Sequence, residues 1–212
     1  MKIITPPIII TSLFHSLEWQ INDARTSRKL YLSFDDGPTP QVTDFVLNQL
    51  CKNSIKASFF CIGANIKKEP QLFQELIKQQ HRVGNHTQHH VNGWKTNTST
   101  YLNEIEACEK ILQEYGYQHD GKPLFRPPYG KITRHQIKAL KHKYRIIMWS
   151  ILGYDWLPYK NPHQCLRNIL KPLRSNAIIV LHDSLKASIN IKHALPEFIK
   201  QAKDQGYTFD KI

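Results

Sequence analysis

Short apolar runs alternate with amphipathic segments from residue 29 to the end of the chain. The runs are rich in Ile, Val, Phe and Tyr, and short runs of this kind between polar segments are typical of buried β-strands. We therefore predict seven strands, over residues 29–34, 57–62, 82–85, 123–126, 145–150, 177–181 and 207–209.

The segments between these strands place apolar residues at helical spacing. Val42, Val46 and Leu50 share one face of the first such segment. Thr39 is suited to cap that helix, and Pro40 is suited to its first position. The sequence therefore predicts a helix that begins directly after Thr39.

Two further helix signals lie later in the chain. Thr133 and Gln136 have the spacing of a capping box, which predicts a helix start at this point. Residues 189–203 also have a helical pattern, but Pro196 falls inside it. Because proline breaks a helix interior, we predict two short helices there.

The alternation of strand and helix predicts one α/β domain over residues 27–212. Its sheet is expected to be mostly parallel, and either open or closed into a barrel. Residues 1–26 lack the alternation. We therefore expect them to form an N-terminal extension packed on the outside of the domain.

Charge narrows the choice of partners. The 212 residues carry a formal net charge of +12. Lys and Arg are spread along the chain and are not gathered with aromatic residues in an arm or a stripe, which argues against a nucleic-acid partner. The excess of positive charge does favour anionic partners such as acidic polymers.

Hydropathy argues against a membrane span. No apolar stretch approaches the ~20 residues that a spanning helix needs. The apolar residues near the N-terminus are interrupted by Pro6-Pro7, and no small-x-small cleavage pattern follows them. We therefore expect a cytoplasmic protein, with an extracytoplasmic location as the alternative.

The four cysteines are Cys51, Cys61, Cys108 and Cys165. None of them forms a CxxC pair, and Cys61 lies inside an apolar run. Because buried free thiols are common in such runs, we predict that all four are reduced residues of the core.

Polar residues that can do chemistry follow the predicted strands. Asp35 and Asp36 end the first strand, and two carboxylates against an apolar strand are costly unless something uses them. His86 ends the third strand, Arg126 the fourth and His182 the sixth. The carboxyl ends of parallel strands share one face, where active sites are built. The sequence thus predicts one site at this face.

Residue types and spacing also predict a metal ion. His86 and His90 are four residues apart, so on a helical turn both could reach one ion. The pattern is not HExxH, so a carboxylate must come from elsewhere, and Asp35 or Asp36 is the best source. Two His and one carboxylate leave room for water and substrate. Because His89 lies between the two histidines, spacing alone leaves the choice of ligands open.

Each of these motifs also has an ordinary structural interpretation. The Asp-Asp-Gly-Pro segment at 35–38 could be a polar turn, Arg126 could lie in a surface loop, and His182 could be an exposed strand end. The turn explains the glycine and proline well, but it explains two carboxylates beside an apolar strand poorly. The occurrence of all the motifs at one end of the sheet favours a functional site.

With these residues the chain resembles the polysaccharide deacetylases that carry the NodB homology domain, in carbohydrate esterase family four. The resemblance spans about residues 28–210. The chain departs from the family pattern at His89, where Ser or Thr is common, and at Val91, where Pro often follows. The resemblance rests on five ordered motifs: Ser33-Phe34-Asp35-Asp36-Gly37-Pro38, His86-Thr87-Gln88-His89-His90, Arg126-Pro127-Pro128-Tyr129, Asp155-Trp156 and Leu181-His182.

The resemblance implies a fold and a metal centre. The expected fold is a distorted (β/α) barrel of about seven parallel strands in a single domain. Asp36, His86 and His90 are implied to bind one divalent metal ion, most often Zn²⁺, with Co²⁺, Ni²⁺ or Mn²⁺ as alternatives. Asp35 is implied to be the general base, and Arg126 to orient it.

The resemblance also implies roles on the other side of the site. The backbone N–H of Tyr129 is implied to help hold the oxyanion. His182 is implied to be the general acid, with Asp155 tuning it. Trp156 and Leu181 are implied to line the pocket for the acetyl methyl group.

These roles together describe a metal-dependent hydrolase that removes N-acetyl groups from a glycan containing N-acetylglucosamine and releases acetate. Peptidoglycan, chitin oligomers and lipid-linked sugars all remain open as substrates. An amide or imide hydrolase acting on a small non-sugar substrate is one alternative. A non-catalytic glycan-binding module is another, although a binding module has no need of a metal ion with a base beside it.

Overall fold

Parallel pairing joins the strands into one curled sheet in the computed structural model, which describes residues 3–22, 28–158, 161 and 163–212. The strand order is β5-β4-β3-β2-β1-β7-β6, and β8 pairs with the first half of β1. This arrangement is the parallel α/β architecture that the sequence predicted. The strands are β1 (Lys29–Asp35), β2 (Ser58–Cys61), β3 (Arg82–Asn85), β4 (Leu124–Phe125), β5 (Arg145–Ile146), β6 (Ile151–Leu152), β7 (Ala177–His182) and β8 (Thr208–Asp210).

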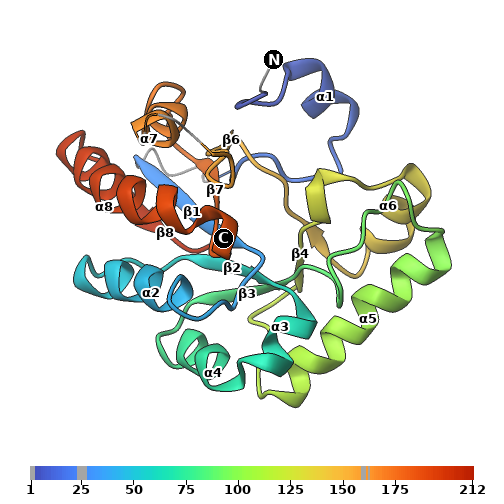
Figure 1. The fold of residues 1–212 in the computed structure, drawn as a ribbon. Coiled ribbons are helices and arrows are strands. Elements are labelled where there is room, and N and C mark those ends of the chain that lie inside the picture. The colour runs from blue at the N-terminus through green and yellow to red at the C-terminus, as the bar shows by residue number, and fades with distance from the viewer. Residues whose placement is uncertain (1–2, 23–27, 159–160, 162) are drawn as a thin grey trace.

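Helices cover the outer face of the curled sheet (Figure 1). The largest apolar cluster lies between them and the strands, because each helix buries one apolar face against the sheet. The helices are α1 (Ile8–Leu13), α2 (Thr43–Lys52), α3 (Gly63–Lys68), α4 (Pro70–Lys78), α5 (Thr98–Glu114), α6 (Arg134–Leu140), α7 (His163–Leu170) and α8 (Ser188–Asp204), with short 3₁₀ turns η1 (Pro128–Gly130) and η2 (Leu185–Ala187).

The central pair of strands is apolar along almost its whole length. β1 and β7 pair in register from Leu30 opposite Ala177 to Asp35 opposite His182. Almost all residues of both strands are buried, as expected where both faces of a parallel sheet are covered. The register therefore brings Asp35 and His182 side by side at the carboxyl ends of the two strands.

The predicted strand over residues 145–150 is two strands. β5 pairs with β4, whereas β6 pairs with β7 at the opposite end of the strand order. Between them the backbone changes partners, because the Met148 N–H donates to the carbonyl of Glu18 and the Ser150 N–H to the carbonyl of Ile178. An apolar run shows burial, but it does not show that its hydrogen bonds go to two different strands.

Two predicted helix boundaries are wrong and one is confirmed. α2 begins at Thr43 and not after Thr39, because the Thr43 hydroxyl accepts the Thr39 N–H at 2.7 Å and closes a turn there. α8 continues through Pro196, since buried Leu195 and Phe198 anchor the helix on both sides of the proline. The capping box at the start of α6 is confirmed, with Thr133 as the N-cap residue.

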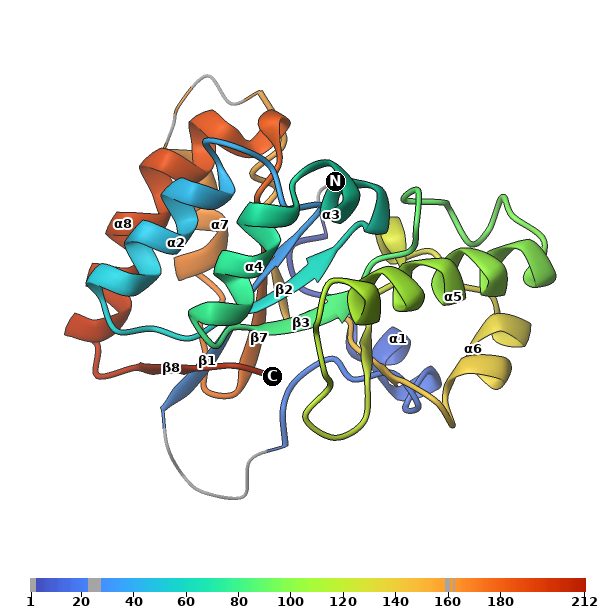
Figure 2. The same ribbon diagram turned by 90° about the horizontal axis from the view of Figure 1, so that it is seen from below.

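The N-terminal segment is more deeply integrated than an extension packed on the outside. Glu18 pairs with the chain beside β5, and Gln20 with the start of β7, so the segment joins two regions of the sheet. Leu17 is buried, and the carbonyl of Ile4 accepts the N–H of Leu152 at 2.9 Å. α1 lies on the side of α6 (Figure 2).

The four cysteines are free thiols, as predicted. Cys61, Cys108 and Cys165 are buried, but Cys51 is exposed, because it lies on the outer face of α2. In the part of the chain that the structure describes, no helix combines the length and the apolar character needed to cross a bilayer.

Candidate active site

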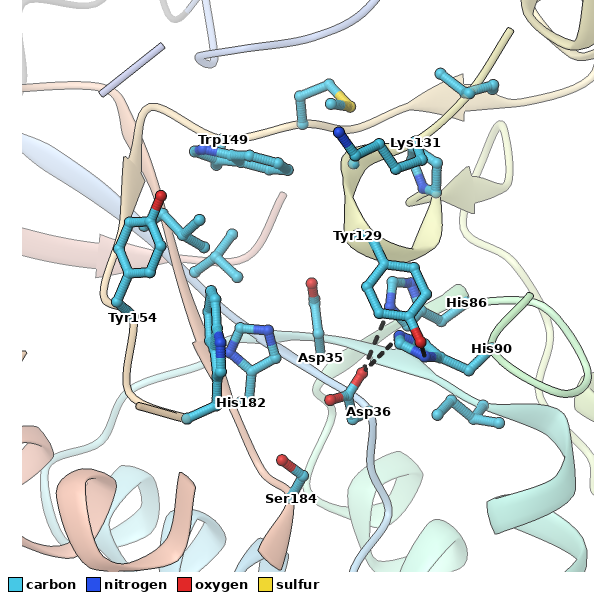
Figure 3. Close-up of a pocket in the computed structure, with 18 of the residues that line it drawn as sticks. Asp35, Asp36, His86, His90, Tyr129, Lys131, Trp149, Tyr154, His182 and Ser184 are labelled. Carbon is cyan, nitrogen blue, oxygen red and sulfur yellow. Dashed lines mark hydrogen bonds and ion pairs between the residues drawn. The ribbon is translucent and has the colours of Figure 1, made fainter. Parts of the chain in front are cut away.

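One cavity of about 1080 Å³ opens at the carboxyl ends of the strands. Asp35, Asp36, His86, His90 and His182 all line it, and Figure 3 shows them facing a common space. They come from the ends of β1, β3 and β7 and from the loops that follow. The prediction that strand ends bring these residues together is therefore confirmed.

Asp36, His86 and His90 form a compact group of metal-ligating type. Nε2 of His86 lies 3.6 Å from Oδ1 of Asp36, and Nε2 of His90 lies 3.2 Å from the same oxygen. That oxygen is buried and has no hydrogen bond of ordinary geometry, even though His90 is close. An uncompensated carboxylate oxygen facing two imidazole nitrogens fits a divalent metal ion, and Zn²⁺ favours this donor set.

The second nitrogen of each ring is held by the protein. Nδ1 of His86 lies 2.8 Å from the carbonyl of Arg126, and Nδ1 of His90 lies 3.1 Å from the hydroxyl of Tyr129. Partners of this kind fix the orientation of metal-ligating histidines. They leave both Nε2 atoms directed towards Asp36 (Figure 3).

The two histidines do not lie on a helical turn, so that part of the prediction is wrong. Residues 86–90 form an irregular loop, in which Thr87 and His90 have φ angles of 64° and 56°. The side chain of Asn85 accepts the N–H of Thr87 at 2.9 Å and holds this loop. His89 turns away instead, with Nδ1 3.0 Å from Glu104 and a side chain that is 63% exposed.

Burial and charge set the protonation of the ligand group. Burial is the largest influence on the pKa of His86 and lowers it to about 4, although the Asp35 carboxylate opposes this. Burial alone would raise the pKa of Asp36, but His90, His182 and His86 hold it below its usual range. At neutral pH the group is thus a carboxylate with a neutral His86 imidazole, as metal binding requires.

Arg126 is fully buried behind Asp35. Its guanidinium donates to Oδ1 of Asp35 at 2.6 Å and to the hydroxyl of Ser33 at 2.9 Å. It also donates to the carbonyls of Ile147 and Met148. Burial lowers the pKa of Arg126, and the Asp35 carboxylate opposes this. Asp35 is therefore paired with a fixed positive charge on one side and faces the cavity on the other.

His182 has a carboxylate partner of its own. Nδ1 of His182 lies 2.8 Å from Oδ1 of the fully buried Asp155, and the backbone N–H of His182 donates to Oδ2 at 2.6 Å. Burial alone would lower the pKa of His182, but Asp155 raises it to about 9, with help from Asp36 and Asp35. Trp156 packs edge-on against the His182 ring at 4.6 Å. His182 is therefore protonated at neutral pH.

Several pocket residues have unusual backbone conformations. Asp36, His90, Tyr129 and Tyr154 have φ angles of 81°, 56°, 58° and 55°, in the left-handed region that non-glycine residues rarely adopt. Such conformations collect at functional sites, where the surroundings enforce them. Within the described chain the Tyr129 N–H donates to no acceptor, so it is free to bind a ligand.

Leu181 does not line the cavity, in contrast to the prediction. It is fully buried in the main apolar core, while Val180 and His182 line the cavity. Side chains alternate along a strand, so neighbours of Val180 and His182 point to the opposite face of β7. Trp156 lies on the cavity wall as predicted.

Asp183 was not assigned a role from the sequence, although it directly follows His182. Its side chain accepts the N–H of Gly37 at 3.0 Å and the hydroxyl of Thr43 at 2.6 Å. Burial raises its pKa to about 7. A Cβ on Gly37 would lie 2.0 Å from the Asp183 carboxylate, so only glycine fits there. This contact holds the turn that follows Asp36.

Most of the aromatic lining was missed from the sequence, which placed only Trp156 on the pocket wall and used Tyr129 for its backbone N–H. All four tryptophans of the chain line this one cavity, and single apolar residues in a sequence give no sign of such convergence. Tyr129 and Tyr154 join them. The tryptophans are Trp19, Trp94, Trp149 and Trp156.

Comparison with known proteins agrees with this geometry. The chain is 33% identical over 184 residues to a peptidoglycan-N-acetylglucosamine deacetylase of Bacillus cereus, covering 84% of this chain and 64% of that protein. It is 30% identical over 194 residues to the peptidoglycan-N-acetylglucosamine deacetylase PgdA of Listeria monocytogenes, covering 91% of this chain and 40% of that protein. The chain thus spans less than two thirds of the length of these two relatives.

The fold has a solved counterpart. The crystal structure of the Bc1960 peptidoglycan N-acetylglucosamine deacetylase, in complex with 4-naphthalen-1-yl-N-oxidanyl-benzamide, superposes with a TM-score of 0.86 at 28% identity. It covers 98% of this chain and 95% of the other. The sequence profile of the family described as "Polysaccharide deacetylase" matches residues 22–145. The chain therefore belongs to the polysaccharide deacetylase family, with the NodB homology fold of carbohydrate esterase family four.

Proposed function

We propose that this chain is a metal-dependent hydrolase that removes N-acetyl groups from a glycan containing N-acetylglucosamine. One molecule of water is consumed, the amide C–N bond breaks, and acetate and a free amino group are formed. The observation that carries this proposal is the placement of two groups with different charged partners, Asp35 and His182, beside Asp36, His86 and His90. Asp35 is paired with a buried guanidinium, and His182 is protonated by virtue of Asp155.

The residues on the cavity wall suit the proton transfers of amide hydrolysis. Asp35 acts as the general base and accepts a proton from the attacking water, while Arg126 fixes its orientation. His182 acts as the general acid and gives its proton to the leaving nitrogen, which is otherwise a poor leaving group. The Tyr129 N–H donates to the oxyanion as it forms. Asp155 holds His182 in its charged form.

Asp36, His86 and His90 are the residues that would hold the metal ion. A divalent ion bound there supplies Lewis-acid polarisation of the amide carbonyl and a lowered pKa of water. We expect Zn²⁺, because two imidazoles and one carboxylate are its usual catalytic ligands, with Co²⁺, Ni²⁺ or Mn²⁺ as alternatives.

Peptidoglycan is the substrate class that we favour, because the two relatives described above are named for it. Lys68, Lys131 and Lys186 on the cavity wall are available to pair with acidic groups of such a glycan, although the carboxylates of Asp35, Asp36 and Glu69 also line the cavity. A peptidoglycan substrate would place the enzyme outside the cytoplasm, which is the alternative location that the sequence left open.

An acetate-release assay tests the proposal. The panel contains peptidoglycan, N-acetylglucosamine oligomers and a small non-sugar N-acyl amide, each with and without a chelator and with Zn²⁺ added back. We expect acetate from glycans, loss of release with the chelator and recovery with Zn²⁺. Hydrolysis of the small amide alone would favour the non-sugar hydrolase, and glycan binding without any release would favour a binding module.

A further inference from the structure

A second pocket, of about 280 Å³, lies at the amino end of β3, whereas the proposed catalytic residues lie at the carboxyl ends of the strands. Its wall comes from the end of α4 and the residues that follow, from the loop between α5 and β4, and from the residue directly after β8. Among the described residues, none lines both this pocket and the catalytic cavity. The second pocket is therefore a separate feature of the fold.

His81 is buried in the wall of this pocket and has one ring nitrogen without a partner. The N–H of Ala57 donates to Nδ1 at 3.2 Å, so Nδ1 is the unprotonated nitrogen of the ring. Burial lowers the pKa of His81 to about 4, and Lys56 and Lys211 add to this effect, so the ring is neutral at neutral pH. The proton therefore lies on Nε2, which is buried and makes no hydrogen bond within the described chain.

Tyr117 brings a second donor to the same wall. Its hydroxyl oxygen accepts the N–H of Val83 at 2.9 Å, and its own proton has no acceptor among the residues that the structure describes. Burial raises the pKa of Tyr117, so this proton stays in place at neutral pH. His81 and Tyr117 thus give the pocket wall two donors without acceptors, and a buried unpaired donor is costly until something accepts from it.

Two cationic side chains also line the pocket. Arg82 donates through Nη2 to the carbonyls of Asp120 and Lys122, at 2.7 Å and 3.5 Å, so it holds the loop that closes one side of the pocket. The ammonium group of Lys211 has no hydrogen bond or ion pair within the described part of the chain. The carboxylate on this wall is that of Asp120, which is exposed. Two cations against one carboxylate favour an anionic ligand.

Donors without acceptors, beside two cations, define the kind of ligand that fits. A phosphate-type oxyanion carries negative charge on several oxygens, so it accepts from more than one donor at once. The volume of about 280 Å³ lies just below the ~300–1,000 Å³ typical of pockets for drug-sized ligands. The pocket therefore has room for one small oxyanion and not for a stretch of glycan chain.

We propose that this pocket binds a phosphate-type oxyanion, either as a free ion or as a group on a larger molecule. His81 and Tyr117 are its buried donors, and Arg82 and Lys211 supply the charge. Because the pocket lies apart from the catalytic cavity, the inference goes beyond the proposed function and does not rest on it.

Inorganic phosphate is the first probe. The full chain is titrated with it at neutral pH while the imidazole signals are followed by NMR, and His81→Gln identifies the His81 signal by its disappearance. Lys211→Met removes one cation from the pocket wall. Lys200→Met is the matched control, because Lys200 is exposed on α8 and lines neither pocket.

We expect a saturable shift of the His81 signal with a Kd on the order of 1 mM, since a few charge-assisted hydrogen bonds give a modest affinity. The affinity should fall about tenfold in Lys211→Met and stay unchanged in Lys200→Met. Calorimetry on the same three proteins measures this ratio without any assignment of signals. An unmoved His81 signal, or equal affinity of the two lysine variants, would overturn the proposal. A shift confined to His182 would also overturn it, because the ion would then lie in the catalytic cavity.

A second titration distinguishes the two sources of the oxyanion. A hexose monophosphate replaces inorganic phosphate, and the His81 signal is followed as before. Tighter binding of the sugar phosphate would support a phosphate group on a larger molecule as the ligand. Equal or weaker binding would support the free ion, and no binding of either probe would overturn the proposal.

Discussion

His86 and His182 face the same cavity from opposite sides, yet their pKa values move in opposite directions. Burial lowers the pKa of His86 to about 4, whereas Asp155 raises the pKa of His182 to about 9 against the effect of burial. Both rings are mostly shielded from water, with side chains 2% and 14% exposed. Burial alone therefore does not explain the difference.

The partner of Nδ1 explains it. Nδ1 of His86 faces the neutral carbonyl of Arg126 at 2.8 Å, and Nδ1 of His182 faces the carboxylate of Asp155 at the same distance. A carbonyl accepts a hydrogen bond from a neutral imidazole and leaves Nε2 as a metal ligand. A buried carboxylate favours the imidazolium and makes the ring an acid. Histidine is thus suited to metal binding at position 86 and to acid catalysis at position 182, because the partner of Nδ1 differs.

Removing one of the proposed metal ligands should have the largest effect on activity. We expect His86→Ala to lose most of the bound metal and nearly all acetate release, because two ligands remain where three were available. Metal content is measured by elemental analysis of the purified protein. His89→Ala is the matched control, since His89 pairs with Glu104 and faces away from the group. Full metal occupancy in His86→Ala would remove it from the ligand set.

Asp35→Asn should separate metal binding from turnover. The variant keeps the hydrogen-bonding shape beside Arg126 but cannot accept a proton, so we expect about a 10²–10⁴-fold loss of kcat with metal content unchanged. Parallel assays of acetate release and metal content check this. Joint loss of metal and activity would instead make Asp35 a ligand.

The sequence predicted the strand-end residues well, because strand ends follow from apolar runs and their polar neighbours. Asp35 and His182 lie at the carboxyl ends of β1 and β7, and the alternation of elements implies that these ends share one face. The path of the His86–His90 loop could not be predicted, since it depends on positive φ angles and on the contact of Asn85 with Thr87.

Other errors have the same origin in tertiary contacts. The split of the 145–150 run depends on hydrogen bonds to the N-terminal segment, which no local pattern reveals. Leu181 was placed on the cavity wall by the family resemblance, but strand alternation turns it into the core. The position of residues 3–19 along the cavity, beside residues 149–156, also depends on contacts in space that no local pattern reveals.

Removing the proposed acid, His182, should reduce the rate of hydrolysis by a factor that depends on the leaving group of the substrate. We expect His182→Ala to reduce hydrolysis of the N-acetyl amide by about 100-fold or more. Hydrolysis of an activated acetate ester should fall by less than about tenfold, because its leaving group needs no proton. Steady-state rates on the two substrates check this. Equal losses on amide and ester would exclude His182 as the acid.

Neutralising Asp155 should have a smaller effect, seen as a shift along the pH axis. The acid works while His182 is protonated, so kcat/KM falls on the basic side as pH rises through its pKa. In the metal-free protein that pKa is about 9, and a divalent cation held nearby would lower it. Asp155→Asn removes the main interaction that raises it, so we expect the basic limb to move down by up to about two pH units. An unmoved limb would show that another group controls it.

The most direct test is an NMR titration of the imidazoles in the metal-free protein. His86→Gln and His182→Gln identify the two signals by their disappearance. We predict that His182 titrates near pH 9 and that His86 stays neutral until the pH falls to about 4. Titration of both rings together near the unperturbed value of ~6.5 would contradict the division of the cavity into a ligand side and an acid side.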